Sequence, residues 1–135
     1  MKKLLDKAYR FLSFRPRSEK EIKDYLKKKK TPAGSIQKII DELKRQKLVD
    51  DLEFSRWWIE QRNTFRPKGK IALKIELRQK GVTREIMEEV IEEMVDEFAL
   101  AKKVFQKKKS PDFLARRGFS WSTIKKVLDE SAKKE

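Results

Sequence analysis

Three stretches of the chain repeat one spacing of apolar residues followed by an acidic pair. Each stretch begins at a leucine, has apolar residues 10, 13 and 14 positions further on, and ends in two adjacent carboxylates. The three sets are Leu26, Ile36, Ile39, Ile40 and Asp41–Glu42; Leu77, Met87, Val90, Ile91 and Glu92–Glu93; and Leu114, Ile124, Val127, Leu128 and Asp129–Glu130. Because residues three and four apart share one face of an α-helix, this spacing predicts a helix with a buried stripe in each stretch. One register fits all three sets, which indicates tandem copies of a small helical unit.

Helix-end signals divide each copy into three helices. Gly81 and Gly118 are expected just past helix ends, where glycine suits a left-handed backbone. The helix-start signals are Ser18 with Glu21, Asp50 with Glu53, Thr83, Ser110 before Pro111, and Ser120. The sequence therefore predicts an all-α fold of three tandem three-helix, helix-turn-helix-like repeats. They span 1–49, 50–95 and 96–135, and the third has a shortened middle helix.

The strings SFRPRS and TFRPKG occur fifty-one positions apart, at 13–18 and 64–69. A residue before proline is pushed out of the α region, so each string ends a helix, at about Phe14 and Phe65. In the simplest interpretation the Phe packs the helix end and the Arg lies at the negative end of the helix dipole. The alternative is a cationic surface that meets a repeating anionic partner. Its residues are Arg15, Arg17, Arg66 and Lys68.

The 135 residues carry a formal charge of +14, from 36 basic and 22 acidic side chains. The charge is uneven: it is +10 in residues 1–47, −1 in 48–94 and +5 in 95–135. Two basic ends around a near-neutral middle attract polyanions or an acidic protein groove. The alternative is that the lysines serve solubility alone.

Neither cysteine nor histidine occurs in the chain. Their absence excludes disulfides and argues against the usual zinc sites and histidine acid–base chemistry. No phosphate-binding loop or nucleophile motif occurs either, so we expect no enzyme activity, cofactor or metal. Charges interrupt the first residues, MKKLLDKAYRFL, which therefore do not form a signal peptide, and no stretch approaches membrane-span length. We expect a cytoplasmic protein.

Further basic residues cluster at three places. Lysine runs at 27–30 and 107–109 end two expected helices, and mobile, solvated side chains are the simplest interpretation of both. Lys70, Lys74 and Arg78 recur every four residues and form one basic ridge. This ridge either pairs with glutamates or faces a partner.

Trp121 is expected to be exposed, because its equivalents in the other copies are Ala33 and Arg84. Beside Arg116 and Arg117 it can stack on a base or anchor a protein contact. Local packing at the start of the last helix is the alternative.

An acidic stripe and an aromatic pair complete the candidates. Three interpretations of the acidic stripe stay open. It is an ordinary solvated face, it repels nucleic acid from one side of the protein, or it pairs with the basic first repeat or with a basic partner. Phe54 and Trp58 fit the core stripe of their helix, and Trp57 lies at its margin, where its role stays undecided. The acidic stripe consists of Glu85, Glu88, Glu89, Glu92, Glu93 and Asp96.

Several strings resemble motifs of the RecX family of bacterial regulatory proteins. The family's DD…FA…R motif is similar to LVDDLEFSRWWIEQR, residues 48–62. Its Gly–(x)7–Leu–x–x–Lys–Gly segment is similar to GKIALKIELRQKGV, residues 69–82, and its first-repeat motif to RPRSEKEIKDYL, residues 15–26. The resemblance covers nearly the whole chain. The departures concern packing: they are Ser55 in place of alanine, TPAGS in place of a common glycine break, and the bulky Trp57–Trp58 pair.

The resemblance implies an elongated, curved helical array that binds RecA recombinase filaments and inhibits RecA's ATPase and strand exchange. Its setting would be homologous recombination, DNA repair and the SOS response, with binding to single- or double-stranded DNA as well. We expect a monomer without membrane contact. Together with the basic clusters above, the expected contact residues are Arg15, Arg17, Lys27, Lys28, Arg66, Lys68, Lys70, Lys74, Arg78, Lys107, Lys108, Arg116, Arg117 and Trp121.

Two other interpretations stay open. Three-helix units with this charge also fit a sequence-tolerant DNA-binding module that has no RecA partner. A purely structural helical scaffold is the second alternative.

Overall fold

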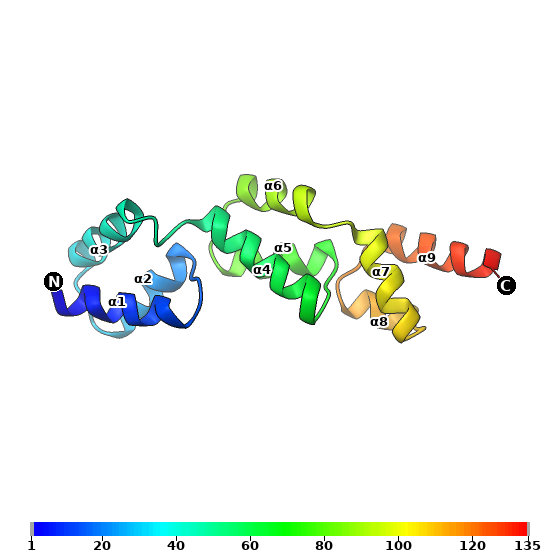
Figure 1. The fold of residues 1–135 in the computed structure, drawn as a ribbon, viewed down its shortest axis with the longest axis horizontal. Helices are drawn as coiled ribbons and strands as arrows, with labels where there is room; N and C mark the ends of the chain where they lie inside the picture. Colours follow the sequence, from blue (N-terminus) through cyan, green and yellow to red (C-terminus); the bar gives the residue numbers. More distant parts are fainter. Residues whose placement is uncertain (1, 135) are drawn as a thin grey trace.

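A computed structural model describes residues 2–134, and in that range it consists of nine α-helices without a strand. The helices form three groups along one long axis, and the two chain ends lie at opposite ends of the array (Figure 1). We call these groups the first unit (α1–α3), the second unit (α4–α6) and the third unit (α7–α9). The bounds are α1 (Lys2–Phe14), α2 (Glu19–Lys28), α3 (Ala33–Arg45), α4 (Asp51–Phe65), α5 (Lys70–Gln79), α6 (Arg84–Met94), α7 (Glu97–Lys107), α8 (Pro111–Arg116) and α9 (Trp121–Lys134). The predicted all-α fold of tandem three-helix units is confirmed, and the division at 49/50 and 95/96 stays a prediction.

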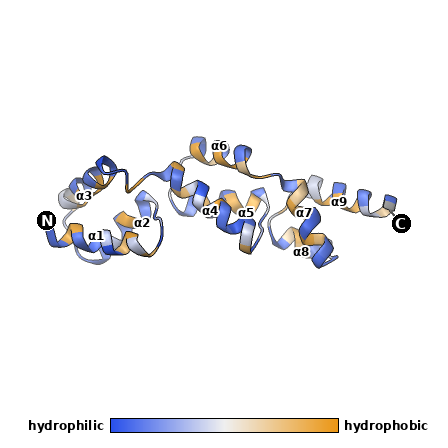
Figure 2. Ribbon diagram, in the orientation of Figure 1, coloured by the Kyte–Doolittle hydropathy of each residue, from blue (hydrophilic) through white to orange (hydrophobic). Residues whose placement is uncertain are grey.

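Each unit has its own hydrophobic core. Leu26, Leu77 and Leu114, which open the three repeated sets, are all fully buried, one in each core. The most extensive helix contacts, α4 with α6 and α7 with α9, also lie within units. Hydrophobic and hydrophilic stretches alternate along the helices of every unit (Figure 2), as expected for helices with one apolar face. The repeated register therefore specifies three small cores in a row.

Most of the predicted helix starts are confirmed. Ser18 and Glu21 form a complete capping box, in which each side chain accepts the other residue's backbone N–H. Ser110 caps α8 ahead of a proline at the first helical position. Asp50 caps α4, but Glu53 does not complete a box there, because its carboxylate pairs with Arg56 (2.6 Å). Helix α8 has six residues against ten in α2 and α5, as predicted for the third unit.

The ends of the middle helices reveal one strained position. Gly81 and Gly118 have positive φ angles of 79° and 85°, as predicted. Lys30 holds the equivalent position after α2 and adopts the same left-handed conformation with φ of 59°. Helix α2 therefore ends like the others, although its sequence lacks the glycine.

Replacing Lys30 with glycine is expected to raise the free energy of unfolding by about 1 kcal/mol. The left-handed conformation is costly for a side chain with a Cβ and free of that cost for glycine. Urea unfolding followed by circular dichroism measures the change. The matched control is Lys28→Gly in the last turn of α2, which is expected to lose up to about 1 kcal/mol. A loss of stability in Lys30→Gly would contradict this account of the helix end.

The predicted packing of the two FRP phenylalanines is wrong. Phe14 and Phe65 are 76% and 73% exposed, and neither ring belongs to a core. Each lies in the last turn of a helix that is longer than the helix after it: α1 has 13 residues and α4 has 15, against ten in α2 and in α5. We attribute the exposure to the shorter middle helix, which leaves the last turn of α1 and of α4 without a partner in its own unit.

Candidate anion-binding groove

The second and third units meet through backbone atoms. The Gly69 N–H donates to the Arg117 carbonyl (2.9 Å), and the Ile71 N–H donates to the Gly118 carbonyl (3.2 Å). A Cβ on Gly69 would lie 2.3 Å from the Gly118 carbonyl oxygen, so only glycine permits this approach. The contact fixes the start of α5 against the turn between α8 and α9.

A buried carboxylate completes this junction. Glu97, at the start of α7, is 8% exposed and accepts hydrogen bonds from the Lys70 N–H (2.7 Å), Ser120 Oγ (2.7 Å) and Thr123 Oγ1 (2.5 Å). These donors lie at the N-terminal ends of α5 and α9, where helix dipoles favour a negative charge. Burial alone would raise the pKa of Glu97, but the hydrogen bonds outweigh it and lower that pKa below its ordinary value. Glu97 therefore joins two units in its ionised form.

A carboxylate also joins the first and second units, at what we call the first junction, but here hydrogen bonds do not outweigh the effect of burial on its pKa. Asp51, at the start of α4, accepts the Glu19 N–H at the start of α2 (2.9 Å). Burial raises the pKa of Asp51, one backbone hydrogen bond only partly offsets it, and the nearby Glu19 carboxylate raises it further. At both junctions the first helix of one unit therefore contacts the start of the middle helix of the preceding unit: α4 contacts α2, and α7 contacts α5.

A hollow of about 570 Å³ opens between the end of α4 and the helices α7 and α8. We call it the junction groove. Four cations line it, and none of its described lining residues is acidic. Two aromatic rings, Phe65 and Phe113, lie among the cations. The cations are Lys103, Lys107, Lys108 and Arg117.

The cations of the junction groove have few internal partners. The Phe113 ring lies between Lys108 (4.4 Å) and Arg117 (4.7 Å), which stack on it as cations on an aromatic face. Among the described residues, Lys103 and Lys107 take part in no ion pair, whereas the neighbouring Lys102 pairs with Glu130 (3.0 Å). The groove therefore presents unneutralised positive charge.

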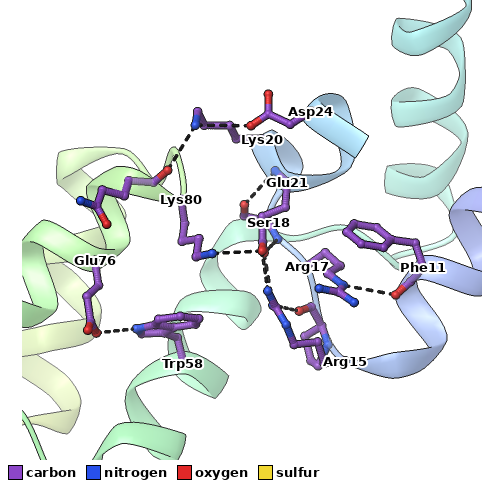
Figure 3. A network of polar contacts seen from close by, with 12 residues as sticks. Phe11, Arg15, Arg17, Ser18, Lys20, Glu21, Asp24, Trp58, Glu76 and Lys80 are labelled. Atoms are coloured by element: carbon purple, nitrogen blue, oxygen red, sulfur yellow. Dashed lines mark hydrogen bonds and ion pairs between the residues drawn. The ribbon is translucent and has the colours of Figure 1, made fainter. Parts of the chain in front are cut away.

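The equivalent cations of the first junction are neutralised (Figure 3). Glu21 pairs with Arg15 (2.5 Å) in its own unit and with Lys80 (3.2 Å) at the end of α5. Burial alone would raise the pKa of Glu21, but these cations and the Ser18 N–H lower it below its ordinary value. Fifty-one positions after Glu21 the chain has Ala72. The second junction therefore lacks this carboxylate.

The second cation of each FRP string, Arg17 or Lys68, is also held internally. In the first unit Arg17 lies over the Phe11 ring (3.8 Å), and this ring stacks on Tyr25 (4.2 Å). In the second unit the residues fifty-one positions after Phe11, Arg17 and Tyr25 form an ionic cluster instead. In it Glu76 pairs with Arg62 (2.9 Å) and with Lys68 (3.7 Å). Of the four predicted FRP cations, Arg66 alone is exposed.

The tryptophan pair lies at the edge of the second core. Trp57 and Trp58 are both half-buried. The Trp58 Nε1 donates to Glu76 (2.9 Å), as Figure 3 shows. Arg15 of the first unit lies 5.6 Å from the centre of the Trp57 ring, so the undecided Trp57 belongs to the first junction.

The basic ridge on α5 lies beside the acidic stripe of α6. Lys70 and Lys74 line one hollow together with Glu88, Glu89 and Glu92, and Lys74 and Arg78 line a second one with Glu88. A hydrogen bond from Arg84 lowers the pKa of Glu88, and the Lys74 charge adds to this shift. Nearby carboxylates thus reduce the field of this ridge.

The remaining predicted contact residues lie on open surface. Trp121 is 68% exposed, as predicted, and Lys27, Lys28 and Arg116 are exposed as well. None of these four lines the junction groove. The groove combines the predicted Lys107, Lys108 and Arg117 with residues that sequence reasoning missed. The missed residues are Lys103, Phe65 as an exposed ring, and Phe113.

Comparison with known proteins gives one consistent result. Residues 5–43 match the first three-helix domain of RecX and residues 50–91 match the second. The regulatory protein RecX of Prosthecochloris aestuarii is 36% identical over 141 residues, which cover 96% of this chain and 93% of that protein. The chain belongs to the RecX family.

Other RecX proteins are longer or known in three dimensions. RecX of Bacillus pumilus is 35% identical over 147 residues, but the match covers 97% of this chain and only 56% of that protein. The chain thus spans little more than half the length of some relatives. The crystal structure of RecX from Lactobacillus salivarius superposes with a TM-score of 0.81 at 23% identity and covers 96% of this chain and 94% of that one. This likeness concerns the fold.

The described residues offer neither a membrane-spanning helix nor a cluster of metal ligands. Within residues 2–134 no helix has the length and apolar character needed to cross a bilayer. In the same part of the chain no group of three or more acidic side chains is arranged to hold a metal ion.

Proposed function

We propose that this RecX protein regulates the RecA recombinase by binding RecA–DNA filaments, and that it lowers RecA's ATP hydrolysis and strand exchange. The match of its first two units to the RecX three-helix domains supports this most. The relatives are named regulatory proteins. The proposal includes a role in recombinational DNA repair and the SOS response, in the cytoplasm, as a monomer without catalytic activity of its own.

The shape and charge of the array support a bridging mechanism. Three units in a row offer surfaces to successive subunits of a filament, which also repeats along its length. Backbone hydrogen bonds at Gly69 and Gly118 and the buried Glu97 join the second and third units tightly. A stiff array that contacts adjacent subunits resists the movements that accompany ATP turnover. Its unpaired cations favour acidic protein surface and DNA phosphate.

The test is RecA's DNA-dependent ATPase measured at increasing concentrations of the chain. We expect turnover to fall as the filament becomes saturated, because only an occupied filament is restrained. Saturation is followed separately by co-sedimentation at the same salt concentration. Unchanged turnover on a saturated filament would rule out the proposal.

A DNA-binding module without a RecA partner is the second candidate. The junction groove favours it, because four cations and two rings without a carboxylate suit nucleic acid directly. Affinities for bare DNA and for a RecA filament at matched salt separate the two functions. Equal affinity with a steep loss in salt supports the module, and a preference for the filament supports the regulator.

A further inference from the structure

We propose that the junction groove is a binding site for a single-stranded nucleic acid, and that the equivalent first junction is not. Phosphates would lie against Lys103, Lys107 and Arg117, and one unstacked base would lie on the Phe65 ring. This inference deepens the proposed function by naming the ligand of the groove.

The two junctions differ in the charge of the residues that line their hollows. The hollow at the first junction contains two carboxylates, Asp50 and Glu53, beside two cations, Arg17 and Lys47. Glu21 already pairs with Arg15 and Lys80 there. The junction groove has no acidic residue in its described lining. Because Ala72 stands where the first unit has Glu21, the position that would neutralise the second junction is uncharged. An anion therefore meets a lining of net positive charge at the second junction and a lining of balanced charge at the first.

The cations of the groove suit the oxygens of a phosphate. The guanidinium of Arg117 can bind a phosphate through two parallel hydrogen bonds, and each lysine ammonium contacts phosphate oxygens as a point charge. Three of the four groove cations are lysines. Lys103 and Lys107 are four residues apart on α7, so they are neighbours on one face about 6 Å apart along the helix. This row can follow a charged backbone.

The aromatic rings favour a single strand over a duplex. Phe65 is 73% exposed and borders two hollows, the junction groove and a smaller one lined by Trp57, Trp58 and Arg66. A base can stack on such a ring only when its own face is free, as in a single strand. The groove volume of about 570 Å³ lies in the range of pockets for small ligands. It admits a base with its sugar.

The test is fluorescence anisotropy of the full chain with a labelled oligothymidylate and with a duplex that has the same number of phosphates. The double variant Lys103→Gln/Lys107→Gln is expected to weaken single-strand binding on the order of tenfold. It should also reduce the slope of log affinity against log salt by about 1.4, since each phosphate contact on a single strand contributes about 0.7. The matched control is Lys125→Gln/Lys126→Gln, which removes the same charge from exposed positions on α9 of the same unit. Equal losses in both double variants would overturn the site in favour of net charge alone.

A second pair of variants tests the stacking. Phe65→Ala is expected to weaken single-strand binding on the order of tenfold and to leave duplex binding unchanged. The control is Phe14→Ala, which removes the equally exposed ring of the first unit. Equal affinities of the two variants, or an equal loss for the duplex, would overturn the stacking role. Tighter binding of polyglutamate than of oligothymidylate would assign the groove to an acidic protein segment instead.

These measurements are made without RecA. Loss of single-strand binding in the groove variants thus tests the groove, and the RecA ATPase of the wild-type chain tests the proposed function. Each can fail while the other holds.

Discussion

Glu97→Ala is expected to lower the free energy of unfolding by about 3 kcal/mol. The substitution leaves three donors at the second junction without their acceptor, and bonds to a charged acceptor are worth about 1.5–3 kcal/mol each. Part of that loss is recovered when water enters. The three donors are the Lys70 N–H, Ser120 Oγ and Thr123 Oγ1. Urea unfolding followed by circular dichroism measures the change.

Two control variants separate the junction from the charge. Glu92→Ala removes an exposed carboxylate of the acidic stripe and is expected to change stability by less than about 0.5 kcal/mol. Glu97→Gln keeps the shape but replaces one acceptor oxygen with a donor, which faces another donor, so it should also destabilise. If Glu97→Ala were as mild as Glu92→Ala, Glu97 would not join the two units.

The stabilisation by Glu97 should depend on pH with a definite sign. The pKa of Glu97 is lowered in the folded chain by its hydrogen bonds, despite burial. A group with a depressed folded pKa contributes stability above its unfolded pKa, about 4.3 for glutamate, and loses it as pH falls through the folded value. The difference in unfolding free energy between wild type and Glu97→Ala should therefore be full at neutral pH and shrink below about pH 4. A difference that grows on acidification would contradict this.

Local and periodic features of the fold could be predicted from the sequence. The helix caps at Ser18 and Ser110 depend on residues three positions apart, and the buried leucines follow a spacing that one helix face dictates. The lysine run at 27–30 was expected to end α2, and α2 does end there. The left-handed conformation of Lys30 was not predicted, because no glycine marks this position.

Tertiary features could not be predicted in the same way. Ile71 and Ile75 are about half exposed on α5, while Leu73 and Leu77 are buried, and composition alone does not distinguish them. Glu97 directly follows the acidic stripe in sequence, and only the approach of Lys70 and α9 makes it a buried acceptor.

The candidate groove was predicted in part for the same reason. The lysine run at 107–109 and Arg117 were visible as charge in the sequence. Lys103 and Phe113 join them only because the second junction brings α4, α7 and α8 together. The two FRP strings look alike, yet their cations differ in exposure, because Glu21 has Ala72 as its counterpart. The repeated FRP strings alone do not predict this difference in exposure, because Glu21 and Ala72 lie outside them.

Gly69→Ala is expected to lower the free energy of unfolding by about 3 kcal/mol, near the upper end for an overpacked contact. The backbone at Gly69 has φ of −77°, which alanine adopts freely, so the cost is steric. The added Cβ would lie 2.3 Å from the Gly118 carbonyl oxygen and 2.4 Å from the Phe119 Cα. These are backbone atoms that cannot rotate away, so the second and third units must separate and lose the hydrogen bonds at Arg117 and Gly118. Urea unfolding again measures the loss.

Gly34→Ala is the matched control, because it adds the same methyl group where no atom lies within 4 Å. Gly34 is in the first turn of α3, and alanine there should raise the unfolding free energy by up to about 1 kcal/mol through helix propensity. Opposite signs for the two substitutions would identify the junction, and not glycine content, as the source of the effect. Equal signs would mean that the units do not depend on this contact. Because separation of the second and third units would move α4 away from α7 and α8, Gly69→Ala should also weaken single-strand binding in the junction groove, whereas Gly34→Ala should leave it unchanged.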